Sequence, residues 1–163
     1  MSKKQIDDFK EVLRQGMIKN FELAGYLTPI MFFYKAGQPI ITEIPNEYLA
    51  SDAGKHGLAE IIKKICQEPD TMMAGIIIEA YGAKIHTEKD SEEAKAVLSG
   101  EKKVRDIEGR QDIIIMIASS PEGEEVKSYI VDPENKAVGE EFTGKGADEM
   151  SGTFSHFFNW NKN

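Results

Sequence analysis

The sequence predicts a single α+β domain, with an antiparallel-dominated sheet of five or six strands and two main helices on one face. Three observations lead to this class. Isoleucine outnumbers leucine 19 to 6, which favours strands because β-branched side chains suit a pleated surface. The length of 163 residues suits one domain. Two segments have apolar residues at helical spacing, and the others are short apolar runs bounded by turn residues.

The first helix begins near Ser2 and ends before Gly25. Ser2 and Gln5 have the spacing of a capping box, and Gly25 can take the left-handed conformation that ends a helix. Apolar residues recur at steps of three and four along one face: Ile6, Phe9, Val12, Leu13, Met17, Phe21 and Ala24. We expect this face to pack on the chain's own sheet, and a partner-binding face is the alternative.

A hairpin and a second helix follow. Strands are expected over residues 28–34 and 39–44, joined by a short loop in which Gly37 supplies a positive φ. The second helix runs from Ser51 or Asp52 to Gln67, because Pro69 stops it. Four residues form its apolar face: Leu58, Ile61, Ile62 and Ile65.

The remaining strands are predicted over 72–80, 111–119, 126–131 and 136–143. Residues 75–78 are apolar on both faces, which predicts a central strand. The last strand is a short edge strand whose glutamates protect it from edge-to-edge pairing. Residues 86–110 hold seven acids and six bases and form a long connection, with a short helix over 91–98.

Composition argues against several functional classes. The net charge is −8, and residues 121–149 hold nine acids against three lysines, whereas nucleic-acid binders need cations.

With a single cysteine, Cys66, the chain has no internal disulfide and no Cys-rich zinc site, and we expect this thiol to be buried. The histidines lack metal-ligand spacing, so no metal and no cofactor is expected. No apolar run approaches the ~20 residues that span a membrane. A cytoplasmic protein of bacterial type is the simplest account.

The order of elements resembles a group of small uncharacterised bacterial α+β proteins. Their pattern is a hairpin ending near a proline, a crossover helix, a strand ending Glu-Ala-aromatic, a charged loop and a hairpin. The matching stretches are Pro29 to Pro45, Gly57 to Ile65, Glu79-Ala80-Tyr81, Arg110-Gln111-Asp112 and Val126 to Gly139. The resemblance covers residues 28–140, with Tyr81 where the group often has Trp. It implies the fold and no established activity.

The strongest candidate for a polar site combines five residues: Glu79, Tyr81, His86, Arg110 and Asp112. Glu79 and Tyr81 alternate along one expected strand, and Arg110 and Asp112 alternate along the next, so each pair shares a face. If the strands are neighbours, these groups converge under the 86–110 loop. They could bind an anionic small molecule or act as a general acid–base pair. An Arg–carboxylate clamp that fixes strand register is the structural alternative.

The domain is predicted to end at residue 143, and residues 144–163 form a Gly-containing linker with an aromatic tail. Four residues of the tail could dock on a partner: Phe154, Phe157, Phe158 and Trp160. Packing on the chain's own sheet and disorder are the alternatives.

No catalytic motif is present, so we expect a non-catalytic protein interaction module that self-associates or binds another protein. A small-molecule binder or enzyme using Glu79, Tyr81 and Arg110 is the alternative.

Overall fold

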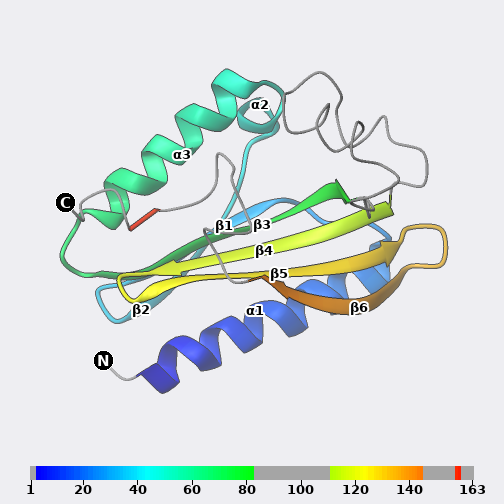
Figure 1. Ribbon diagram of the computed structural model, residues 1–163, viewed down its shortest axis with the longest axis horizontal. Helices are drawn as coiled ribbons and strands as arrows, with labels where there is room; N and C mark the ends of the chain where they lie inside the picture. The colour runs from blue at the N-terminus through cyan, green and yellow to red at the C-terminus, as the bar shows by residue number, and fades with distance from the viewer. Residues whose placement is uncertain (1–2, 83–110, 145–156, 159–163) are drawn as a thin grey trace, which may run out of the picture.

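Six strands form one antiparallel sheet in the order β2-β1-β3-β4-β5-β6 (Figure 1). The structure is a computed structural model that describes residues 3–82, 111–144, 157 and 158. The strands are β1 (Ile30–Lys35), β2 (Gln38–Glu43), β3 (Thr71–Gly82), β4 (Gln111–Ser120), β5 (Gly123–Asp132) and β6 (Ala137–Gly144). The helices are α1 (Lys3–Ala24), α2 (Asn46–Leu49) and α3 (Asp52–Cys66). Every neighbouring pair of strands is antiparallel, which confirms the predicted α+β class.

The two long helices cover opposite faces of the sheet, with α1 on one side and α3 on the other (Figure 1). The prediction that both helices share one face is therefore wrong. Neighbouring residues of the inner strands show the reason. Phe32 packs with the α1 core and Phe33 with the α3 core, and Ile77 and Ile76 divide in the same way. Because these strands are apolar on both faces, each face needs its own helix.

Helix α1 contributes one buried stripe to its core: Phe9, Leu13, Met17 and Phe21. The Phe9 ring meets Phe32 edge to face, with ring centroids 6.1 Å apart. Gly25 has a φ of +79°, and its N–H donates a 2.7 Å hydrogen bond to the carbonyl oxygen of Phe21. The predicted C-terminal glycine stop is therefore confirmed. Ser2, the other end of the predicted helix, lies outside the described residues.

Helix α3 begins as predicted, because the Ser51 Oγ accepts a 3.0 Å hydrogen bond from the Gly54 N–H. Its buried residues are Leu58, Ala59, Ile62 and Cys66. Of the predicted apolar face, Ile61 is exposed. None of the helices in the described part of the chain is long and apolar enough to cross a membrane.

The β1–β2 hairpin turns through Ala36 and Gly37, whose φ angles of +54° and +75° are both positive. Two residues with positive φ make the tight turn that matches the twist of antiparallel strands. Lys35 pairs with Gln38 directly across this turn. The turn fixes the register of the whole hairpin, and through it the direction in which each backbone group of β2 points.

Candidate interaction surface

The predicted polar site at the end of the sheet is partly assembled. Tyr81 pairs in register with Asp112, and Glu79 pairs with Ile114, so β3 and β4 are neighbours as the prediction required. Glu79 and Asp112 line one pocket of about 320 Å³. His86 and Arg110 lie outside the described residues. The structure therefore brings two of the five predicted residues into one pocket.

Electrostatics in this pocket do not favour an anion. Burial raises the pKa of Glu79, a hydrogen bond from the Leu27 backbone lowers it in part, and the Asp112 carboxylate raises it further. The residues that line the pocket are Gly25, Tyr26, Glu79, Ala80, Asp112, Ile113 and Pro133. None of them is basic, so the described part of this site carries negative charge only.

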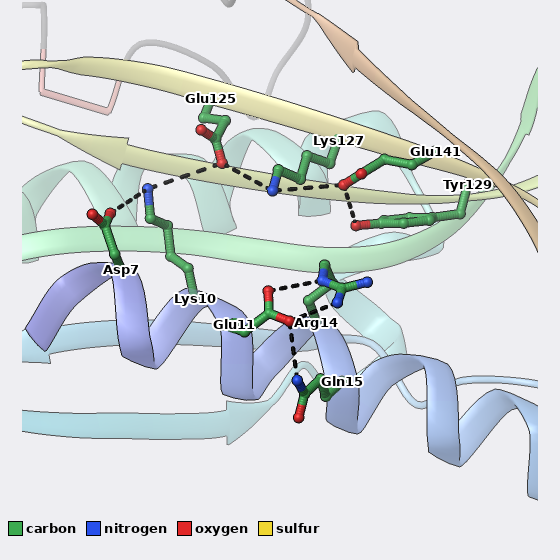
Figure 2. A network of polar contacts seen from close by, with 9 residues as sticks. All are labelled: Asp7, Lys10, Glu11, Arg14, Gln15, Glu125, Lys127, Tyr129 and Glu141. Atoms are coloured by element: carbon green, nitrogen blue, oxygen red, sulfur yellow. Dashed lines mark hydrogen bonds and ion pairs between the residues drawn. The ribbon is translucent and has the colours of Figure 1, made fainter. Parts of the chain in front are cut away.

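A polar network lies between α1 and the strands β5 and β6 (Figure 2). On α1, the Arg14 guanidinium donates to both carboxylate oxygens of Glu11, at 2.9 and 2.6 Å, and the Gln15 amide donates to the same group at 3.0 Å. These hydrogen bonds, that of Arg14 first, lower the pKa of Glu11 to about 2. The Glu11 carboxylate is therefore ionised at neutral pH.

The same network ties the helix to the sheet (Figure 2). Lys10 on α1 reaches Glu125 on β5 at 3.9 Å. Lys127 lies 3.7 Å from Glu125 and 3.6 Å from Glu141 on β6, and the Tyr129 hydroxyl donates a 2.8 Å hydrogen bond to Glu141. Each cation faces at least one carboxylate, so this network does not present a free charge to a ligand. The partly exposed Lys10–Glu125 pair adds little to the packing that holds α1 on the sheet.

Phe157 is 0% exposed and belongs to the core under α3, with Leu58 and Ile62 among its cluster. Phe158 packs against the same cluster. Phe157 is therefore a packing residue and not a docking residue, and the domain extends beyond the predicted boundary at residue 143. The other two predicted docking residues, Phe154 and Trp160, lie outside the described residues.

An apolar hollow of about 550 Å³, here called the α1–β2 groove, opens between α1 and the edge of the sheet. Helix α1 contributes Val12, Gly16, Asn20 and Leu23, which recur at steps of three and four beside the buried stripe. Ile41 and Glu43 of β2 line the opposite side. Val12, Leu23 and Ile41 are all exposed, so the groove presents apolar side chains to water.

Strand β2 is the outer strand on this side, and all six of its residues are exposed. The Ile44 N–H donates a 2.8 Å hydrogen bond to the Pro29 carbonyl of the β1 side. Backbone groups in an antiparallel ladder alternate in direction, so the N–H and C=O of Ile41 and Glu43 point away from β1. Pro39 also points outward but has no N–H. This outward row is here called the β2 edge.

The sequence pattern predicted a strand over 39–44 but did not mark it as an open edge. The signal was available in Ile40 and Ile41. Two consecutive apolar residues place one on each face of a strand, and Pro39 is typical of a strand with one unpaired side.

No family model matches the chain, and no curated protein and no solved structure is significantly similar to it.

Proposed function

We propose that the protein is a non-catalytic interaction module that self-associates, and that its contact surface is the β2 edge with the adjoining α1–β2 groove. One observation carries the proposal. Ile40 and Ile41 are 40% and 55% exposed on opposite faces of a strand whose outer backbone groups have no neighbouring strand in the described part of the chain. An exposed apolar edge of this kind is a template for pairing with another strand.

The two edges of the sheet differ in charge. Strand β6 carries Glu140 and Glu141 side by side, and consecutive acids on an edge oppose pairing with an acidic partner. In β2 the only charged residue is Glu43, at the end of the strand. The contrast supports β2 as the contact edge.

The low charge of β2 suits a second copy as the partner, although the overall charge opposes contact elsewhere. Each chain carries a net charge of −8, so two copies repel one another over most of their surfaces. Contact through the β2 edge brings together the edge of the sheet that holds less charge than β6. A basic partner would instead be attracted to acidic β6. Symmetric pairing of one surface with its own copy is the commonest arrangement in soluble oligomers.

Sedimentation velocity of the full chain tests self-association directly. Samples from about 1 to about 100 micromolar cover the affinities expected of a small edge interface. We expect the mean sedimentation coefficient to rise with concentration from that of a monomer to that of a dimer. A monomer at every concentration would refute the proposal.

A second candidate function is a small-molecule site in the Glu79–Asp112 pocket. It is favoured by the raised pKa of Glu79 beside a second carboxylate in one pocket. Two carboxylates without a basic neighbour suit a cationic ligand. A thermal-shift screen of amine-containing metabolites is the test. The candidate predicts a compound that raises the Tm of the wild type but not of Glu79→Gln, and equal shifts for both proteins would reject it.

A further inference from the structure

We infer that two copies join through β2 in one register, with Ile41 directly opposite the partner's Ile41 on the two-fold axis. The inference rests on the proposed self-association and specifies its geometry. In this arrangement the sheets of the two copies become continuous, and the axis runs perpendicular to the sheet between the two β2 strands.

The backbone of the β2 edge supports this register. Two opposed Ile41 residues exchange both of their N–H···O hydrogen bonds, because both point away from their own β1 strand. Each Glu43 then lies opposite Pro39 of the partner subunit, and its N–H donates to the proline carbonyl. The missing N–H of Pro39 falls at the two ends of the contact and leaves the central Ile41 pair complete.

The two neighbouring registers are less stable, one because it loses hydrogen bonds and the other because it brings like charges together. A shift of two residues toward the turn places Pro39 opposite the partner's Ile41. The complete Ile41 pair is then lost, and only the two bonds from the Ile41 N–H groups to the Pro39 carbonyls remain. The opposite shift places the two Glu43 carboxylates on a diagonal with Cβ atoms about 7–8 Å apart, where like charges repel. With Ile41 on the axis, the two Glu43 residues lie about 13 Å apart along the strands.

The side chains of this register are also compatible on both faces. On the α1 face, the two Ile41 side chains meet between the two α1–β2 grooves. On the α3 face, Ile40 lies opposite Thr42 of the partner subunit, in the closely spaced type of antiparallel pair. Contact between side chains that lie opposite one another across strands stabilises a sheet.

Engineered disulfides test the register. The native Cys66 does not interfere, because it is buried and burial raises the pKa of its thiol to about 12. Opposed Ile41→Cys residues would have Cα atoms about 5.5 Å apart, within disulfide range, whereas Glu43→Cys residues would be too distant. We expect mild oxidation with copper phenanthroline to convert Ile41→Cys, and not Glu43→Cys, to covalent dimers on non-reducing gels.

A mixture provides the matched control. Ile40→Cys and Thr42→Cys, each alone, should stay monomeric on the gel, and their mixture should form a covalent heterodimer. If the wild type dimerises by sedimentation but Glu43→Cys cross-links in place of Ile41→Cys, the register is refuted and self-association stands. If the wild type is monomeric and no variant cross-links, both the register and the proposed function fail.

Discussion

Ile41 lies directly opposite Phe32 in the β1–β2 ladder, yet Phe32 is 0% exposed and Ile41 is 55% exposed. Opposed residues in a ladder point to the same face, so the difference between their exposed fractions shows how far α1 covers this face. This cover ends between two adjacent strands. The groove therefore arises because the single helix α1 is too narrow to cover the whole face of the sheet.

This boundary predicts unequal effects on stability. Phe32→Ala should lower the free energy of unfolding by about 3–5 kcal/mol, because it leaves a cavity under α1. Ile41→Ala should change it by about 1 kcal/mol or less, since more than half of the side chain is already in water. Urea denaturation at a protein concentration that keeps the chain monomeric measures both. Equal losses would show that Ile41 belongs to the core.

Two glycines should respond in opposite ways to the same substitution. A Cβ on Gly75 would lie 2.0 Å from the Ile117 carbonyl oxygen and 2.3 Å from the Phe32 ring, so Gly75→Ala should cost about 3 kcal/mol or more. A Cβ on Gly16 in α1 would meet nothing within 4 Å. Gly16→Ala should therefore stabilise the protein by about 0.5–1 kcal/mol through helix propensity. Thermal denaturation compares the two, and a stable Gly75→Ala protein would contradict the close packing of β1, β3 and β4.

Phe157 provides a test of the aromatic tail. Because this side chain is fully buried in the α3-face core, Phe157→Ala should lower the free energy of unfolding by about 3–5 kcal/mol. Phe142→Ala on exposed β6 is the control and should cost about 1 kcal/mol or less. If Phe157→Ala lowered the free energy of unfolding no more than the control, Phe157 would not be part of the core. Docking on a partner would then again be the better interpretation of this residue.

Because the pKa of Glu79 is raised, Glu79→Gln should increase the free energy of unfolding by an amount that depends on pH. The folded state holds the Glu79 proton to a higher pH than the unfolded state, so the wild type loses stability as the pH rises above 4.5 toward the folded pKa. Glu79→Gln removes this loss. Its stability relative to the wild type should increase over that interval and then level off.

The control for this effect is Asp112→Asn. Since the Asp112 charge contributes to the raised pKa, the gain from Glu79→Gln should be smaller in the Asp112→Asn background. Urea titrations between about pH 3 and pH 8 measure the difference. If the increase in stability from Glu79→Gln did not depend on pH, the pKa of Glu79 would not be raised in the folded state.

Local sequence signals predicted most of the fold. The apolar stripe of α1, the Ser51 cap, the Gly37 turn and the central position of residues 75–78 each depend on neighbours in the chain, and the structure has all of them. The placement of the two helices could not be obtained in this way. The choice of face depends on packing across the whole sheet, although the two-sided apolar pattern of Ile76 and Ile77 already indicated that both faces need cover.

The candidate surface was harder to predict than the fold. Val12 lies in the apolar stripe expected to be buried, yet it lines the groove and is exposed, because the buried part of α1 is narrower than the stripe. Phe157 was a candidate for docking, with packing on the chain's own sheet as an alternative, and it packs under α3. Both differences arise from tertiary packing, which periodicity along one element does not report.

The central claim is that the β2 edge joins two copies of the chain, and its most direct test is sedimentation velocity of Ile41→Lys beside Ile61→Lys. Each variant adds one charge at an exposed isoleucine, and Ile61 lies on α3, away from the edge. We predict that Ile61→Lys dimerises like the wild type, whereas Ile41→Lys stays monomeric because two ammonium groups would meet on the two-fold axis. Unchanged dimerisation of Ile41→Lys would contradict the account.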